Sequence, residues 1–291
     1  MRLGVILNPA KPMALQAAVA LAAAAARRGW QVAQISAEAP EPLSGFDRLI
    51  LLGGDGTVLQ WAERMAQAGV PVLPVNLGHL GFLASVSLHQ EEEPDWDRFL
   101  ETEGWVEDRR RLLEVRVGDG QEAPPLVLND ALIARQRSGR TLEVELRVEG
   151  RLLYRYRGDG LLVATPTGST AYAYAVGGPV VDPALPALLA CPVAPHAALP
   201  RAVVLAPGRE VEVAAPRADD VVVVLDGQRQ REVPPGRPVR VRLSTREVRF
   251  LRPASYHPVD ALREGLRRME GLEPAGERPP DRFRAPGEGS G

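Results

Sequence analysis

One acidic residue stands inside a glycine-rich stretch, Gly53-Gly54-Asp55-Gly56-Thr57, which follows an apolar segment and opens a helical pattern. Glycines let a backbone turn sharply and approach a polyphosphate closely, and the N–H groups at the start of a helix offer an anion site. A carboxylate amid phosphate-binding glycines is hard to explain unless it handles a proton or a Mg²⁺ ion. The stretch therefore indicates phosphoryl transfer. The alternative is a plain strand–turn–helix connection in which Asp55 only caps the helix.

A second stretch, residues 159–172 with the sequence DGLLVATPTGSTAY, begins as a strand and ends in a helix. Its turn carries four hydroxyls, from Thr165, Thr167, Ser169 and Thr170. Such a turn can present hydroxyls and backbone amides to a polar ligand. It equally fits a hydroxyl-rich turn in which Ser169 or Thr170 caps the following helix.

Both stretches resemble kinase sequences. GGDGT is similar to the signature of a superfamily that includes NAD kinases, diacylglycerol and sphingosine kinases and 6-phosphofructokinases, and it does not choose among them. Residues 159–172 resemble the long DGxxxxTPTGSTAY block of NAD kinases, and Gly177-Gly178-Pro179 resembles the GGP that follows that block. The longer block is the specific one, so NAD is the expected phosphoryl acceptor.

The resemblance to NAD kinases extends from about residue 4 to about residue 253. Residues 76–83 are similar to the family's NxGxLGFL stretch, Asn129-Asp130 stands at its Asn-Glu pair, and Asp226-Gly227-Gln228 resembles its DGQ turn. Pro195-His196 with Arg201 resembles the PH…RP stretch of the family. Read without the resemblance, Asn129 is an ordinary strand-end residue and Asp226-Gly227 a plain hairpin turn.

The chain departs from the family pattern at four positions. Asp130 is one methylene shorter than the usual Glu, and Ala175 replaces a common Ser. Asp182 stands before a proline where His is common, and Ala202 replaces the second proline of PH…RP. None of the four is the proposed base, so they bear on substrate geometry and leave the chemistry unchanged.

The resemblance implies roles for individual residues. Asp55 would accept the proton of the adenosine-ribose 2′-hydroxyl of NAD, and Asp159 would bind the nicotinamide-bearing half. The loop holding the phosphate donor would consist of Gly53, Gly54, Gly56 and Thr57. The implied NAD-binding residues are Asp55, Gly56, Asn129, Asp130, Arg140, Arg157, Asp159, Thr170, Ala171, Tyr172, Ala173, Tyr174, Ala175 and Gln228. Among these, Arg140 and Gln228 rest on spacing or on a very short motif.

The same resemblance implies the partners of the reaction. ATP or inorganic polyphosphate would donate the phosphoryl group, and NAD would lie between two domains. Mg²⁺ would bridge the phosphate oxygens and draw few ligands from the protein. NAD kinases are generally homodimers or homotetramers, so an oligomer is expected here. Acceptance of NADH, the choice of donor and control by NADP or NADPH cannot be read from the sequence.

The helices and strands that must position these residues form two predicted domains, an α/β domain followed by a mostly β domain. Residues 1–104 alternate short apolar strands with helices, which predicts a doubly wound sheet whose ligands gather beyond the carboxyl ends of its strands. Strands are expected at 2–7, 30–35, 49–52 and 72–75, and helices at 13–28 and 57–68.

Residues 105–252 form the expected second, mostly β domain, which carries the NAD-binding residues. Strands are expected at 113–117, 126–134, 142–148, 152–156, 161–164, 203–205, 211–214, 221–225, 239–243 and 248–251. Helices are expected around 169–176 and near 184–190, and a last amphipathic helix within 253–270 is expected to return to the first domain. Residues 271–291 have the composition of a disordered tail.

Composition excludes several classes of protein. The 291 residues are 45% hydrophobic and 25% charged, with no apolar run of 18 residues and no signal-peptide pattern, so a cytoplasmic protein without a membrane partner is expected. A net charge of −2 opposes nucleic-acid binding. The one lysine, Lys11, lies outside any GxxxxGK[ST] sequence, which excludes a P-loop kinase.

The remaining candidates for chemistry are weak. Cys191 is the one cysteine and has no third group to orient a Cys–His pair, so nucleophilic catalysis is not expected there. The four histidines lack metal-ligand spacing, and no metal site of protein side chains is expected.

Two rival functions share part of this pattern. A diacylglycerol- or sphingosine-type lipid kinase would share Gly53-Gly54-Asp55-Gly56-Thr57, yet it leaves residues 165–172 unexplained, and no basic amphipathic membrane helix is evident. A non-catalytic nucleotide-sensing protein would keep the pocket, yet simple binding does not require the Asp55 carboxylate beside phosphates.

Overall fold

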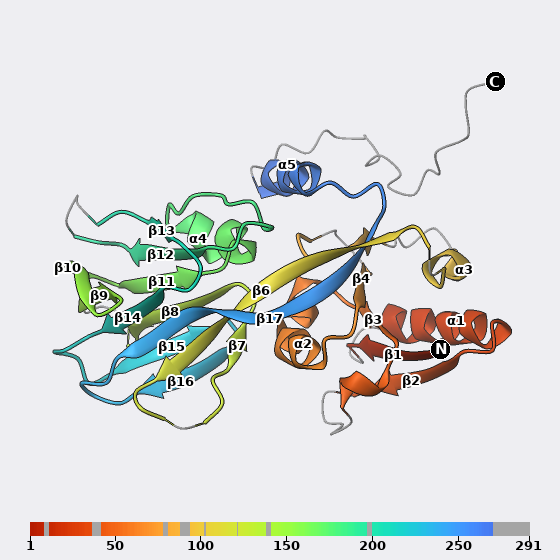
Figure 1. Cartoon of the computed structure of the whole chain (residues 1–291), viewed down its shortest axis with the longest axis horizontal. Coiled ribbons are helices and arrows are strands. Elements are labelled where there is room, and N and C mark those ends of the chain that lie inside the picture. The colour runs from red at the N-terminus through yellow and green to blue at the C-terminus, as the bar shows by residue number, and fades with distance from the viewer. Residues whose placement is uncertain are drawn as a thin grey trace. The chain divides into compact units, whose positions relative to one another are not determined.

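The computed structural model describes residues 1–8, 12–36, 42–77, 81–87, 94–101, 103–120, 122–137, 141–196 and 200–269. The chain divides into two compact units (Figure 1). Unit 1 comprises Met1–Val58, Ala68–Asp108 and the residues from Arg249 onward, and unit 2 comprises Leu59–Gln67 and Arg109–Val248. Helix α2 (Asp55–Ala68) and strands β6 (Trp105–Val117) and β17 (Val239–Pro253) contribute residues to both units.

Unit 1 is built on a parallel sheet in the order β17-β4-β3-β1-β2, with the short β5 beside β4. The strands are β1 (Arg2–Leu7), β2 (Gln31–Ile35), β3 (Arg48–Leu52), β4 (Val72–Asn76) and β5 (Val86–Ser87). Its other elements are the helices α1 (Pro12–Arg27), α3 (Trp96–Phe99) and α5 (Pro258–Met269) and the 3-10 turn η1 (Leu43–Gly45). Every residue of β3 and β4 is buried, as expected of central strands covered on both faces.

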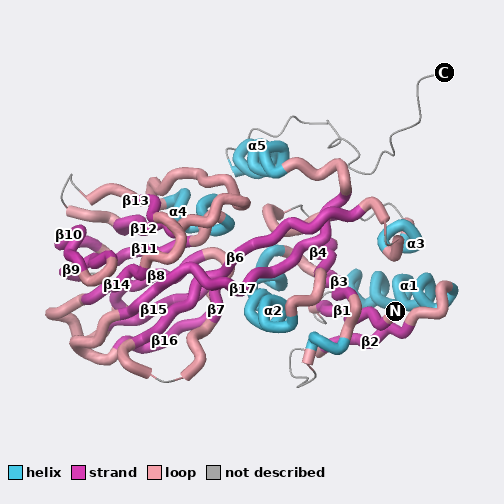
Figure 2. The backbone as a smooth tube through the Cα atoms, in the orientation of Figure 1, coloured by secondary structure: helices cyan, strands magenta, loops and turns pink. Residues whose placement is uncertain are grey.

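Helix α1 shows how the sequence sets these elements. Its alanine-rich face packs in one core cluster with β1 and β3, through residues such as Leu21 and Ala25. Gly29 ends the helix at a φ of +69°, where its lack of a side chain allows the left-handed turn. The backbone then enters β2, which Figure 2 shows in magenta at the edge of the sheet.

Unit 2 is a sandwich of two largely antiparallel sheets. One contains β10 (Arg151–Gly158), β9 (Leu142–Val148), β14 (Glu210–Ala214) and β17 in that order, together with β6 and β7 (Leu126–Val127). The other has the order β13 (Val203–Leu205), β12 (Leu188–Val193), β11 (Gly160–Ala164), β8 (Asp130–Arg135), β15 (Val221–Leu225) and β16 (Arg229–Val233). Side chains from both sheets, among them Val144, Val213, Ile133 and Val223, form the core between them.

Alternation along β11 gives the six-stranded sheet a second buried face. Leu161 and Val163 point into the sandwich core, whereas Leu162 and Ala164 join a separate apolar cluster with Ala173 of α4 (Tyr172–Ala175). The 3-10 turn η2 (Thr167–Thr170) leads from β11 into α4. The TPTGST sequence is therefore fixed between one strand and the helix that covers it.

The predicted fold class, an α/β domain, a mostly β domain and a C-terminal helix, is confirmed. The helix expected near 184–190 is wrong, because Leu188–Val193 forms strand β12 between β11 and β13. All six of its residues are buried, so they read as an apolar run without alternation, which periodicity cannot distinguish from a helix. The strands expected at 239–243 and 248–251 are one strand, β17, and the tail at 271–291 lies outside the described residues.

A buried arginine joins the end of β17 to the core of unit 1. Arg252 is 1% exposed, and its Nε donates to Asp108 Oδ2 at 2.9 Å. Its Nη1 donates to the Leu83 carbonyl at 2.9 Å and to Ser85 Oγ at 3.0 Å. Its guanidinium also lies about 5 Å from the ring centres of Phe250 and Tyr256, at 5.1 and 5.0 Å. The 81–85 segment is thus held by a charge that has been removed from water.

We expect Arg252→Met to lower the free energy of unfolding by about 3–5 kcal/mol, because it leaves Asp108 nearly buried without its cation. Arg249→Met is the matched control on the same strand. Its ion pair with Glu107 is about one-third exposed on each side, so we expect a loss of about 0–1 kcal/mol. Urea unfolding of both variants measures the difference, and equal losses would contradict the assigned role of Arg252.

Candidate active site

The Asp55 carboxylate lies at the first residue of α2 and is held by backbone donors. The Phe82 N–H donates to Oδ2 at 2.9 Å, and the Leu83 N–H donates to Oδ1 at 3.2 Å. Both donors come from the segment that resembles the LGFL part of the NAD kinase pattern. Two sequence motifs of unit 1 therefore meet at one carboxylate, whose orientation is fixed by groups that mutation of side chains cannot remove.

Glycine is required where these segments approach each other. A Cβ on Gly81 would lie 2.2 Å from Asp55 Oδ1, and a Cβ on Gly53 would lie 2.6 Å from Thr57 Oγ1. Neither distance is compatible with a side chain unless Asp55 or Thr57 moves. The glycines of these motifs thus make room for the acidic side chain and for the start of α2.

The environment of Asp55 makes it a stronger base than a solvated aspartate. Burial raises the pKa of the Asp55 carboxyl, and the Phe82 and Leu83 N–H groups and the charge of Arg252 act in the opposite direction. A raised pKa increases the driving force for taking up a proton. The same carboxylate lies at the N-terminal end of α2, where the N–H groups of the first turn point toward an anion.

In unit 2 the Asn129-Asp130 pair is held by a second buried carboxylate. Asp226 accepts hydrogen bonds from the N–H groups of Leu128 (2.9 Å), Asn129 (2.7 Å) and Asp130 (3.2 Å). Its own N–H donates to the Asp130 carbonyl at 2.9 Å. The plain-turn reading of Asp226 is thus incomplete: it has a φ of +50°, as such a turn requires, and it also holds the backbone of the neighbouring strand end.

The hydroxyl-rich turn packs against the same strand end. Thr165 Oγ1 donates to the Leu128 carbonyl at 2.6 Å and accepts from the Gly168 N–H at 3.0 Å. A Cβ on Gly168 would lie 2.1 Å from the Asn129 carbonyl oxygen, so only glycine fits there. Ser169 Oγ, fully buried, donates to the Pro166 carbonyl at 2.7 Å and accepts from the Val181 N–H at 3.0 Å.

Two of the four hydroxyls of this turn therefore serve the fold, as the structural reading of the turn expects. Thr165 and Ser169 are both 0% exposed and are satisfied within the protein. Thr170 is half-buried, and its hydroxyl donates to the Thr167 carbonyl at 3.3 Å. The expected helix at 169–176 is interrupted at Ala171, whose φ of −100° and ψ of −130° separate η2 from α4.

Asp130 is the most strongly perturbed acid of unit 2. Burial, and secondly the nearby Asp226 charge, raise the pKa of its carboxyl to about 7, although the Tyr172 N–H acts in the opposite direction. Burial also raises the pKa of Asp226, against the pull of its three N–H donors. When two carboxyl groups are buried close together, one of them tends to keep its proton. Asp226 accepts three N–H hydrogen bonds that stabilise its charged form, so the proton is expected on Asp130.

The other sequence-predicted residues of unit 2 lie in different surroundings. Arg157 and Asp159 are exposed at the end of β10, and Gln228 is exposed in the turn between β15 and β16. On α4, Tyr172 and Tyr174 are 43% and 37% exposed, Ala175 is exposed, and Ala173 is fully buried in the core. Arg140 lies outside the described residues.

Cysteine chemistry finds little support in this arrangement. Burial raises the pKa of the Cys191 thiol to about 11, which opposes the thiolate that nucleophilic attack requires. Its sulfur lies 2.9 Å from the position of a Cβ on Gly178, so it fills space beside the GGP turn. Within the described part of the chain, no group of three or more His, Cys, Asp or Glu could hold a metal ion.

Sequence reasoning missed four contributors to these sites. Phe82 and Leu83 act through their N–H groups, which no side-chain pattern reveals. Asp226 had a signal in the DGQ resemblance and in its place before a glycine. Arg252 lies in an ordinary strand sequence, and only its burial distinguishes it.

Comparison with known proteins places this geometry in a family. Residues 37–103 match the ATP-NAD kinase N-terminal domain, and residues 128–253 match the ATP-NAD kinase C-terminal domain. The NAD kinase of Symbiobacterium thermophilum is 38% identical over 280 residues, which are 90% of this chain and 97% of the relative. The NAD kinase of Heliobacterium modesticaldum is 36% identical over 86% of this chain and 92% of its own length.

Solved structures agree with the sequence relatives. An NAD kinase from Archaeoglobus fulgidus in complex with ATP matches with a TM-score of 0.73 and 25% identity, over 94% of this chain and 100% of the other. Yeast NADH kinase complexed with NADH matches with a TM-score of 0.75 over 96% of this chain and 89% of the other. At 21% identity, the latter supports the fold alone.

We expect Asp226→Asn to loosen the strand end at Asn129-Asp130 while leaving the turn intact, because Asn tolerates a positive φ. Hydrogen bonds to a charged acceptor contribute about 1.5–3 kcal/mol each, so amide exchange at residues 128–130 should accelerate at least about tenfold. Asp219→Asn, at an exposed position shortly before β15, is the control and should leave that exchange unchanged. Unaltered protection in Asp226→Asn would remove the holding role.

We expect Asp130→Asn to change how stability depends on pH. A carboxyl with a raised folded-state pKa stabilises fully below its unfolded pKa, and that contribution is lost as the pH rises through about 7. Asn keeps the uncharged form, so the variant should gain about 1 kcal/mol or more on the wild type between about pH 4 and pH 8. Urea unfolding across that range is the measurement, and a constant difference would contradict a raised pKa.

Proposed function

The chain belongs to the NAD kinase family, and we propose that Asp55 is the base of its reaction. The reaction transfers a phosphoryl group from ATP to the adenosine-ribose 2′-hydroxyl of NAD and yields NADP. The relatives do not favour the lipid-kinase or the sensing-protein alternative. The observation that supports Asp55 as the base is a carboxylate of raised pKa, held by two backbone N–H groups at the start of a helix.

Phosphoryl transfer asks three things of the protein: an acceptor in line with the donor, neutralised charge on the phosphates, and a destination for the hydroxyl proton. The Asp55 carboxylate provides the destination, because burial makes its protonated form accessible. A loose transition state needs modest help from a base, about 10²–10⁴-fold. Positioning and charge stabilisation would supply most of the remaining acceleration.

The donor phosphates would bind at the N-terminal end of α2, through the loop formed by Gly53, Gly54, Gly56 and Thr57. A Cβ on Gly53 would collide with the Thr57 side chain, so glycine lets the loop backbone lie close against the start of α2. A Mg²⁺ ion would arrive with ATP and be held chiefly by phosphate oxygens. The site fits such an ion, because the Asp55 carboxylate at the start of α2 could offer it one oxygen ligand while the donor phosphates supply others.

Unit 2 would bind the dinucleotide. Asn129 and Asp130 are held rigidly by Asp226 and by the turn at Thr165, as a recognition pair requires. A protonated Asp130 can donate a hydrogen bond as well as accept one, which widens the set of polar groups it can recognise. The exposed Asp159, Arg157, Tyr172, Tyr174 and Gln228 would supply further contacts.

Other features of the protein are proposed on the resemblance alone. We propose a cytoplasmic homodimer or homotetramer that accepts ATP, with polyphosphate as a second donor to be tested. Among the helices of the described residues, none is long and apolar enough to cross a membrane.

We expect Asp55→Asn to lower kcat about 10²–10⁴-fold while the Kd for NAD changes little, because Asn cannot take up the proton. Turnover is measured with ATP, Mg²⁺ and NAD, and NADP is detected with an NADP-specific dehydrogenase. Asp97→Asn is the control, since its carboxylate lies in exposed ion pairs with Arg27 and Arg28. Turnover like that of the wild type would remove Asp55 as the base, and phosphorylation of a diacylglycerol in place of NAD would favour the lipid-kinase reading.

A further inference from the structure

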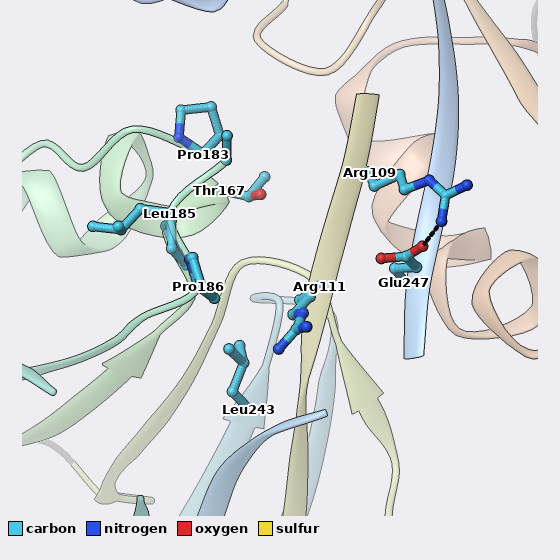
Figure 3. Close-up of a pocket in the computed structure, with 10 residues that line it drawn as sticks. Arg109, Arg111, Thr167, Pro183, Leu185, Pro186, Leu243 and Glu247 are labelled. Carbon is cyan, nitrogen blue, oxygen red and sulfur yellow. Dashed lines mark hydrogen bonds and ion pairs between the residues drawn. The ribbon is translucent and has the colours of Figure 1, made fainter. Parts of the chain in front are cut away.

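A pocket of unit 2 lies apart from the residues assigned to NAD and to the phosphate donor. It is lined by the 183–186 segment, by the start of η2, and by neighbouring parts of β6 and β17 (Figure 3). Its volume is about 180 Å³. Sites for drug-sized ligands usually measure about 300–1,000 Å³, so this pocket suits a small group and excludes a whole dinucleotide.

The walls of the pocket differ in character. Leu185, Pro186 and Leu243 provide an apolar side, whereas Arg109, Arg111 and Thr167 provide donors of hydrogen bonds. Figure 3 shows the Arg111 side chain directed toward Leu243 and Pro186, and the Arg109 side chain directed away toward Glu247. The ligand must therefore be small, and at least part of it must accept hydrogen bonds.

The charges in the pocket leave a positive excess at Arg111. Arg109 Nη1 lies 2.8 Å from Glu247 Oε1, so these two charges largely cancel. Arg111 is exposed, and its side chain forms no hydrogen bond or ion pair with any of the described residues. In a protein where most arginines of β6 and β17 pair with acids, as Arg242 does with Glu114, an unpaired guanidinium in a pocket is the exception.

Thr167 adds a second donor. It is 7% exposed, and its Oγ1 lies 3.5 Å from Nη1 of the buried Arg110, which donates to it. Because the oxygen accepts this bond, the hydroxyl hydrogen is left to donate to a group in the pocket. Arg110 thereby polarises the one hydroxyl of the TPTGST turn that lines this pocket.

We propose that this pocket binds a phosphate group, through the guanidinium of Arg111 and the hydroxyl of Thr167. A planar guanidinium matches two phosphate oxygens at once, and charge-assisted bonds of this kind are stronger than neutral ones. The group can be free phosphate or the end of a longer phosphate chain, since both present the same oxygens. The proposal does not depend on the identity of the kinase substrate.

The test is calorimetric titration of the full chain with inorganic phosphate and, separately, with tripolyphosphate. Arg111→Met should weaken binding to one site at least about tenfold for the ligand that the pocket takes. Arg116→Met, on the same strand and outside the pocket, is the matched control and should bind as the wild type does. Glu247→Gln should tighten binding several-fold, because it removes the one carboxylate among the residues that line the pocket.

Each outcome of the titrations is informative. Arg111-dependent binding of inorganic phosphate identifies a free-anion site, and dependence seen with tripolyphosphate alone identifies a site for the end of a chain. If Arg111→Met and Arg116→Met bind both ligands equally, or if Glu247→Gln does not tighten binding, the proposal is overturned. Asp55→Asn should leave the Arg111-dependent site intact, so failure of the proposed base and failure of this pocket are separable.

Discussion

The structure of unit 1 depends on keeping one carboxylate partly buried and ionisable at the start of a helix. A carboxylate taken out of water needs hydrogen bonds, and Asp55 obtains them from two consecutive backbone N–H groups. Those groups stay in place because Arg252 bonds the Leu83 carbonyl on the other side of the same peptide segment. Gly81, where a Cβ would collide with the Asp55 carboxylate, and the buried pair of Arg252 with Asp108 belong to the same arrangement.

Unit 2 also contains a buried carboxylate that accepts hydrogen bonds from backbone N–H groups, but there the carboxylate positions other residues. Asp226 is the carboxylate that accepts backbone N–H groups, and the residues that it fixes, Asn129 and Asp130, are those assigned to the ligand. Since Asp226 holds its charge by three N–H bonds, the cost of burying two acids falls on Asp130, whose pKa rises. In unit 1 the held carboxylate is the proposed base, and in unit 2 it holds the residues that we propose bind the dinucleotide.

The sequence predicts much of this arrangement where local physics decides it. The α/β alternation, the glycine that ends α1 and the alternating strands such as β9 follow from periodicity and turn chemistry. Prediction from sequence fails where tertiary contacts determine the structure. Strand β12 is buried on both faces, so its residues do not alternate between apolar and polar. Arg252 has the sequence context of an ordinary strand arginine, and only the structure shows that it is buried. The glycines around Asp55 allowed the proposed base to be predicted from the sequence. The N–H groups that hold its carboxylate could not be predicted, because a backbone donor does not depend on the side-chain type.

The hydroxyls of the TPTGST turn show why a motif alone does not assign roles. The hydroxyls of Thr165 and Ser169 form hydrogen bonds with the backbone of Leu128, Pro166 and Val181. Position 168 must be glycine, because a Cβ there would collide with the Asn129 carbonyl. These residues set the shape of the turn, and the ligand contacts that we propose fall on Thr167 and on the residues after Thr170. A match to a motif does not distinguish a residue that shapes a site from a residue that contacts a ligand. The partner to which each side chain is hydrogen-bonded does distinguish them. We therefore propose different ligands for the two ends of this turn, a dinucleotide at α4 and a phosphate group at Thr167.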